Sequence, residues 1–165
     1  MIQATRPAFI SLHKFYSSVL QNEDALRRRL FYAIESGDTE TLRSILQEKS
    51  ELFTLSSSSG QSLMHIAAQA GQASIIETLV DLGYTAIDQV DDLGRTPMFA
   101  ACSGGHLAVI ETLLRFGSCA IDTPNIHGET PMYSAAEMGH SETIKTLMRL
   151  GSNAIDTPDS ESWTP

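Results

Sequence analysis

The apolar residues of this chain recur with the spacing of short amphipathic helices. In the segment 107–116 they fall at positions i, i+1, i+4 and i+5, which places them on one side of a helix. This apolar stripe consists of Val109, Ile110, Leu113 and Leu114. A shorter segment at 98–103 is rich in small residues and predicts a second helix that its neighbours can approach closely. Helices of this length depend on packing against one another.

Capping and turn residues separate the predicted helices. Thr96 and Pro97 are typical of a helix start, because Thr accepts hydrogen bonds from open N–H groups and Pro fits the first helical position. Gly117 lies where a helix end favours a left-handed residue. From there, residues 120–124 are predicted to run as an extended arm to the next turn. One unit is therefore a turn, a helix, a turn, a second helix and an arm.

This unit repeats every 34 residues. Glycines recur at this interval at Gly60, Gly94 and Gly128, and the Thr-Pro-Met that follows Gly94 returns after Gly128. A fixed period in this range indicates supersecondary units that stack on one shared core. Stacked units build an extended surface rather than a closed pocket, which favours binding over catalysis.

These motifs resemble the ankyrin repeat. The family pattern D-x-x-G-x-T-P-L-H-x-A-A-x-x-G-H is matched from Gly94 and Gly128, each of which begins Gly-x-Thr-Pro-Met and is followed by Gly-His eleven residues on. The block that begins at Gly60 keeps Met-His-Ile-Ala-Ala but has Ser62-Leu63 where Thr-Pro is expected. We therefore expect its first helix to begin more loosely.

The resemblance implies an all-α ankyrin-repeat solenoid of helix-turn-helix units joined by finger loops. The predicted divisions are 26–59 as a degenerate first repeat, 60–93, 94–127 and 128–161 as fuller repeats, and 162–165 as the start of a truncated further repeat. On this interpretation the chain is the N-terminal part of a longer protein. The alternative is a protein that ends here with an uncovered apolar edge.

Residues 1–25 are predicted to form an N-terminal helical cap or extension. Apolar residues fall at helical spacing between Phe9 and Leu20, as expected for a helix that covers the end of the first repeat. The alternative is a mitochondrial transit peptide at residues 1–22, because this stretch has basic residues, Ser and Thr but no acid.

Charge and composition narrow the classes of partner. The chain carries a net charge of −9 with a pI near 4.9, which argues against nucleic acid and anionic membranes as partners. No apolar run is long enough to span a membrane. The two cysteines have neither zinc-ligand nor disulfide-scaffold spacing, so we expect the cytoplasm or another reducing intracellular compartment.

No residue pattern predicts catalysis, a metal site or a cofactor. His106 and His140 lie one repeat apart, roughly 10 Å, which is too far for both to bind one ion. The resemblance implies that they make structural hydrogen bonds between units, and that His65 bonds to a loop. Cys102 precedes His106 by four residues, but two glycines intervene, so a Cys–His nucleophile pair is not expected.

The resemblance also implies a binding site on the concave side, formed by the turn tips and the exposed side of each first helix. The corresponding residues that differ between units are Asp92, Leu93, Arg95, Ser103, Ile126, His127, Glu129, Glu137 and Met138. Three of them are apolar where solvent is expected, and acidic residues surround them. This combination favours a partner protein with an apolar centre and a basic rim.

The sequence therefore predicts a non-catalytic protein–protein interaction module or scaffold. We expect a monomer, unless the C-terminal edge self-associates. One alternative is the substrate-recognition region of a multidomain enzyme or effector whose catalytic domain lies beyond residue 165. A structural spacer without a partner is a third interpretation, which the differences between units on the concave side disfavour.

Overall fold

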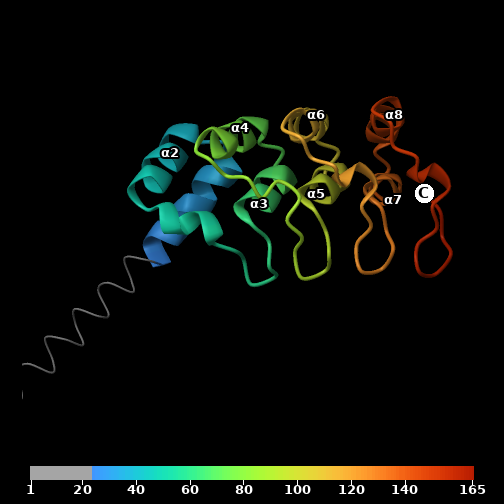
Figure 1. Ribbon diagram of the computed structural model, residues 1–165, viewed down its shortest axis with the longest axis horizontal. Coiled ribbons are helices and arrows are strands. Elements are labelled where there is room, and N and C mark those ends of the chain that lie inside the picture. The colour runs from blue at the N-terminus through green and yellow to red at the C-terminus, as the bar shows by residue number, and fades with distance from the viewer. Residues whose placement is uncertain (1–23) are drawn as a thin grey trace, which may run out of the picture.

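The computed structural model describes residues 24–165, and helices in two layers with loops below them make up this part (Figure 1). The inner layer consists of α3 (Leu63–Gln69), α5 (Pro97–Ser103) and α7 (Pro131–Glu137). The outer layer consists of α2 (Thr39–Glu48), α4 (Ala73–Asp81), α6 (Leu107–Arg115) and α8 (Ser141–Arg149). A further helix covers residues 24–36. The transit-peptide interpretation of residues 1–22 falls outside the described residues, as do residues 1–23 of the cap predicted for residues 1–25.

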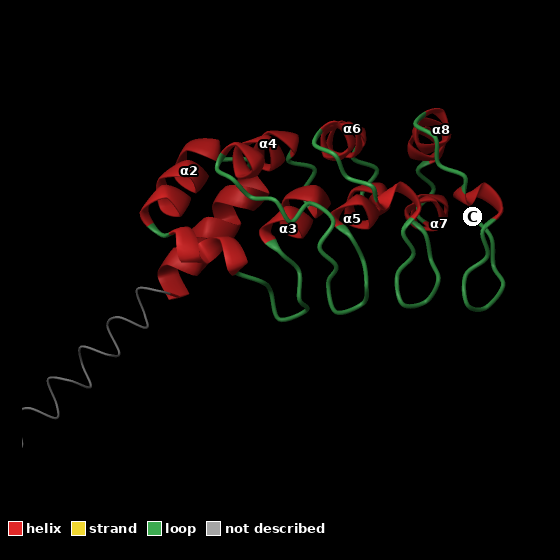
Figure 2. Cartoon of the chain, in the orientation of Figure 1, coloured by secondary structure: helices red, strands yellow, loops and turns green. Residues whose placement is uncertain are grey.

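Finger loops project from the inner layer, and short 3-10 helices interrupt the connections (Figure 2). These are η1 (Ser50–Thr54), η2 (Ala120–Asp122) and η3 (Ala154–Asp156). Within residues 24–165 the pairing of extended backbone is limited to one isolated bridge between Ser56 and Ser62. The predicted all-α solenoid is confirmed.

The capping residues act as the sequence predicts. Thr96 accepts a hydrogen bond from the Phe99 N–H at 3.2 Å, and Pro97 occupies the first turn of α5. Thr130 caps α7 in the same way. Gly117 follows α6 with a φ of +92°, a left-handed conformation that a side chain would strain.

The expectation of a looser start for α3 is wrong. Ser62 donates its backbone N–H to Nδ1 of His65 at 3.2 Å, and its hydroxyl lies 2.8 Å from the same nitrogen. Ser62 and His65 thus form a capping box, although no Thr-Pro begins the helix. α3 and α5 have the same length, seven residues each.

The core is a ribbon that continues through the helix layers. The same position of the outer helices α4, α6 and α8, 34 residues apart, carries a leucine with no exposed surface: Leu79, Leu113 and Leu147. The inner helices contribute methionines that are equally buried at the same interval: Met64, Met98 and Met132. Each unit buries its apolar face only because its neighbours cover it.

The predicted extended arm, residues 120–124, is wrong in its first three residues. Residues 120–122 and 154–156 form 3-10 turns, because an aspartate of the preceding unit fixes the start of each turn. Asp88 accepts hydrogen bonds from the Ser118 hydroxyl at 2.5 Å and the Cys119 N–H at 2.8 Å. Asp122 makes the equivalent bonds one unit later, with Ser152 and the Asn153 N–H.

A second ladder of hydrogen bonds confirms the structural role of the histidines. Nε2 of His106 lies 3.0 Å from the Gln69 carbonyl oxygen, and Nε2 of His140 lies 3.0 Å from that of Ser103. Gln72 occupies the same position one unit earlier and donates to the Glu35 carbonyl at 2.9 Å. The ladder therefore extends to the helix at 24–36.

Candidate functional site

Each finger loop is closed by one short polar side chain. Asp91 accepts hydrogen bonds from the N–H groups of Leu93 at 3.0 Å and Arg95 at 2.9 Å, two and four residues further on. The same pattern recurs at 34-residue spacing with Ser57, Asn125 and Asp159 as acceptors. Sequence reasoning missed this motif, although the short polar residue at a fixed interval is visible in the printed sequence.

Backbone hydrogen bonds join neighbouring fingers. The Asp92 N–H donates to the Ser59 carbonyl at 3.2 Å, and the Ile126 N–H donates to the Leu93 carbonyl at 3.0 Å. Ser160 and His127 make the corresponding bond at 2.8 Å. The fingers are therefore held as one row, which presents their side chains at fixed positions.

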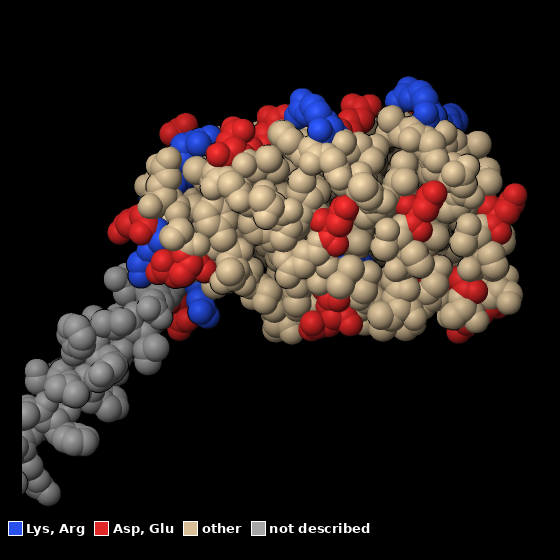
Figure 3. Space-filling view, in the orientation of Figure 1, with Lys and Arg blue, Asp and Glu red and all other residues tan. Residues whose placement is uncertain are grey.

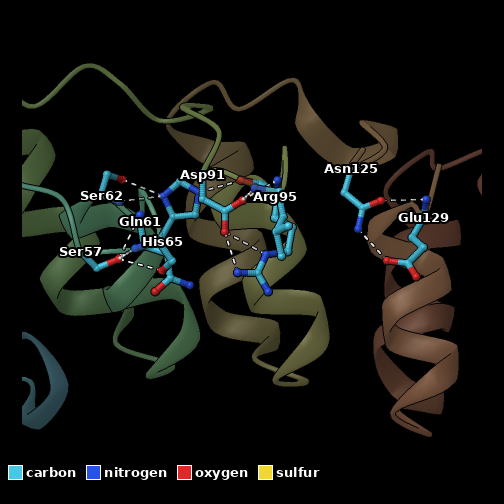
Figure 4. A network of polar contacts seen from close by, with 10 residues as sticks. Ser57, Gln61, Ser62, His65, Asp91, Arg95, Asn125 and Glu129 are labelled. Atoms are coloured by element: carbon cyan, nitrogen blue, oxygen red, sulfur yellow. Dashed lines mark hydrogen bonds and ion pairs between the residues drawn. The ribbon is translucent and has the colours of Figure 1, made fainter. Parts of the chain in front are cut away.

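The fingers differ in charge at the residue four positions after the polar side chain that closes the loop. Arg95 donates to Oδ2 of Asp91 from Nε at 2.8 Å and from Nη2 at 2.7 Å, so this finger is neutral at that point (Figure 4). In the next finger Asn125 donates to Oε2 of Glu129 at 2.6 Å, which leaves the negative charge of Glu129 uncompensated (Figure 4). The first of these fingers carries the uncharged Gln61 instead.

The N-terminal half of the concave side contains a hollow of about 290 Å³ between α3, α5 and their fingers. Two residues of the predicted site, Arg95 and Ser103, line it together with His65, Gln69 and Phe99. Nε2 of His65 lies 2.8 Å from the Arg95 carbonyl oxygen, as the expected loop bond requires. Polar and apolar groups line this hollow about equally and its charges are compensated, so it favours an uncharged segment of a ligand.

His65 makes the fold sensitive to mild acid. Burial lowers the pKa of its imidazole, although the Arg95 carbonyl and the charge of Asp91 oppose the shift. The contribution of neutral His65 to the folding stability is therefore complete above the unfolded-state pKa of about 6.5. It is lost as the pH falls below that value towards the lowered folded-state pKa. Between pH 7.5 and 5.5 we expect the wild type to lose more stability than His65→Gln in urea unfolding, by at most about 1 kcal/mol. Equal losses in both proteins would contradict this assignment.

The C-terminal half contains a hollow of about 330 Å³ that the structure lines with aromatic and acidic residues. His127 and Glu129 of the predicted site lie here with Tyr133, Asp159 and Trp163. A neighbouring hollow of about 250 Å³ shares Tyr133 and Trp163 and adds Glu137. Sequence reasoning missed Asp159 and both aromatic residues, although Trp163 stands 34 residues after Glu129.

Acidic groups surround the Tyr133 hydroxyl. Desolvation, together with the carboxylates of Asp159, Glu137 and Glu129, raises the pKa of this hydroxyl. Desolvation is the largest cause, and the nearby negative charges add to it because they disfavour a further one. A positive charge at the same place is stabilised by the same carboxylates.

The remaining predicted residues are exposed but do not form one patch. Leu93 and Ile126, 41% and 62% exposed, occupy adjacent fingertips, and Asp92 lies beside them. Met138, 54% exposed, follows the last residue of α7 and lies at the opposite end of this helix from the finger. The predicted apolar centre is thus divided between the tips and the far end of α7.

The two sides of the solenoid differ in the way charges are compensated (Figure 3). The outer helices carry basic side chains, and ion pairs join consecutive helices, as between Arg43 and Asp81 at 3.9 Å and between Arg149 and Glu111 at 3.7 Å. Exposed pairs of this kind contribute little to stability. On the finger side of the C-terminal half, no salt bridge is found within the described residues.

The cysteines have no geometry for nucleophilic chemistry. Cys102 is fully buried, and burial raises the pKa of its thiol to about 12. The ring of His106 packs against Gly71 of the preceding unit, 2.7 Å from the point where a Cβ of that glycine would lie. Cys119 is exposed, and its N–H is bound by Asp88.

Family models place this chain in a known class of protein. A model described as ankyrin repeats (3 copies) matches residues 84–160, and one described as ankyrin repeats (many copies) matches residues 30–80. The chain belongs to the ankyrin-repeat family, as the sequence motifs indicate. Proteins of this family are generally non-catalytic protein–protein interaction modules. No curated protein matches the chain. Among the described residues, no helix has the length and apolar character needed to cross a membrane.

Proposed function

We propose that this protein binds a partner protein along its concave side, through the row of finger loops and the inner helices α3, α5 and α7. The observation that carries the proposal is the row itself. Backbone bonds hold the fingertips rigid, while the side chains that they present differ from unit to unit in charge and size. Rigid presentation lowers the ordering cost of binding.

The change in charge along the row of fingers suggests which partner residues each part of the row binds. The hollow between α3 and α5 is lined by uncharged or compensated groups, whereas the hollow beside α7 is lined by carboxylates and aromatic rings. An extended segment with a polar, uncharged half and a basic half complements this surface. The apolar tips Leu93 and Ile126 lie between the two halves and exclude water from the contact.

We further propose that the repeats run over residues 26–59, 60–93, 94–127 and 128–161. Left-handed glycines at 34-residue intervals support these bounds: Gly60, Gly94 and Gly128. The alternative function, target selection for a catalytic domain, uses the same surface and predicts the same effects of the variants below.

Two substitutions on the concave side are expected to abolish partner binding without unfolding the protein. In affinity capture from cell lysate, the Ile126→Glu/Met138→Glu variant should retain at least tenfold less of the protein that the wild type retains. Both substitutions replace an exposed apolar side chain with a carboxylate, which removes apolar contact area and places a charge that must be desolvated on binding. Melting curves of both proteins should agree within about 2 °C, since exposed substitutions change stability little.

The matched control is Met148→Glu. Met148 is 49% exposed, close to Met138, but lies on the outer helix α8. We expect this variant to capture the partner as the wild type does. Equal loss of capture by Met148→Glu, or capture indifferent to the concave variant, would overturn the proposed function.

A further inference from the structure

Within residues 24–165, no lysine or arginine forms a salt bridge with the carboxylates of the C-terminal concave half. After Arg115 the sequence contains one lysine, Lys145, and one arginine, Arg149, and both belong to α8 in the outer layer. Lys145 pairs with Glu142 of its own helix at 2.7 Å, and Arg149 pairs with Glu111 of α6. The negative charge around Tyr133 is therefore available to a cation from outside the chain.

The chain itself shows how such a cation is held. Asp91 uses Oδ1 to close its finger and Oδ2 to accept two hydrogen bonds from the guanidinium of Arg95. Asp159 closes the last finger with the same geometry, since its Oδ1 accepts the N–H groups of Glu161 at 2.9 Å and Trp163 at 2.8 Å. Trp163 stands where Arg95 stands two units earlier, so within residues 24–165 no cationic side chain pairs with Asp159.

Aromatic rings complete the hollow beside this carboxylate. Tyr133 and Trp163 both line the two adjoining hollows, and Trp163 is 65% exposed. A cation above the face of a Trp or Tyr ring is attracted by the ring quadrupole. Because carboxylates of Glu129, Asp159 and Glu137 surround the same space, ring and charge attraction act on one ligand group.

We propose that this hollow binds an arginine side chain of the partner protein, with its guanidinium on the Asp159 carboxylate and against Tyr133 and Trp163. The inference rests on the proposed function and assigns the chemistry of one subsite. Arginine fits better than lysine, because the planar guanidinium stacks on rings and donates two parallel hydrogen bonds to one carboxylate.

Trp163 is a direct probe of this subsite, because it is the single tryptophan of the chain. We propose four pools of nine-residue peptides that differ only in the central residue, which is arginine, citrulline, lysine or alanine. In all four pools the flanking positions are randomised over Gly, Ala, Ser and Leu. Citrulline has the shape of arginine without its charge. Each pool is titrated into the protein, and the Trp163 fluorescence and its indole N–H NMR signal are followed.

We expect the arginine pool to bind at least fivefold more tightly than the citrulline pool, with the lysine pool between them. The Asp159→Asn variant should lower the affinity of the arginine pool about tenfold and leave the citrulline pool unchanged. This variant keeps the finger closed, since Asn125 closes the preceding finger with the same two bonds. Glu142→Gln removes one carboxylate from α8 and should leave all four affinities unchanged.

Equal affinities of the arginine and citrulline pools for the wild type would overturn the subsite. A lysine pool as strong as the arginine pool would overturn the assignment to arginine. These outcomes are separate from the test of the proposed function. If Ile126→Glu/Met138→Glu loses partner capture but the arginine and citrulline pools bind with equal affinity, the concave site stands and the arginine subsite is rejected. If the variant captures the partner as the wild type does, the concave site itself is rejected.

Discussion

Leu113→Ala is expected to lower the free energy of unfolding by about 2–5 kcal/mol. Leu113 has no exposed surface and lies in the core ribbon, where α6 packs against α4 and α5. Removing its isobutyl group takes away buried apolar contacts and leaves a cavity that the stacked helices cannot close fully. Urea unfolding followed by circular dichroism measures the loss, and a melting curve should fall by about 4–15 °C, depending on the size of the loss.

The matched control is Leu93→Ala, which deletes the same group from a fingertip that is 41% exposed. We expect a loss below about 1 kcal/mol, because this side chain remains partly in water in the folded protein. A loss for Leu113→Ala no larger than that of Leu93→Ala would show that the ribbon is not the main source of stability.

Asp91→Ala is expected to destabilise the protein by about 2–3 kcal/mol, although the residue lies in a loop. The side chain of Asp91 has no exposed surface, and it accepts bonds from two backbone N–H groups and the Arg95 guanidinium. Alanine leaves all of these donors without their acceptor. Asp91→Asn keeps Oδ1, as Asn125 does in the next finger, so its loss should be about 1 kcal/mol.

The pH dependence of this pair separates charge from hydrogen bonding. Burial opposes ionisation of Asp91, but the hydrogen bonds and charge of Arg95 and the Leu93 N–H outweigh it, and the pKa of the carboxyl is lowered. Its stabilisation is therefore complete above the unfolded-state pKa of about 3.9 and is lost as the pH falls through the lowered value. The difference in stability between wild type and Asp91→Asn should be constant above about pH 5 and shrink below about pH 4. A constant difference down to pH 3 would contradict the ion pair.

Local signals in the sequence were sufficient for the repeating elements. Thr96-Pro97 predicts the start of α5, Gly117 predicts the end of α6, and the stripe that includes Leu113 predicts the buried face of that helix. These features depend on residues within one or two turns of each other, so a linear pattern carries them. The family resemblance added the stacking order and the side on which we propose that a partner binds.

Other features depend on atoms of neighbouring units and could not be predicted from one unit. The 3-10 turn at 120–122 replaces the expected arm because Asp88, about 31 residues earlier, binds the N–H of Cys119. The first turn of α3 is well fixed because the His65 ring forms hydrogen bonds both with Ser62 and with the Arg95 carbonyl. Distances of this kind are decided only when the units stack.

In the candidate site, too, some features follow from the sequence and others from the stacking of the units. The sequence by itself determined the repeat, the helices, the acidic character and the set of variable positions such as Glu129 and Ile126. The tertiary structure decided which of these positions share a hollow, that Asp91 compensates Arg95, and that Tyr133 and Trp163 lie beside Asp159. The physical reason is that helix periodicity and capping act within a unit, whereas charge compensation and hollow formation arise between side chains that meet only across units.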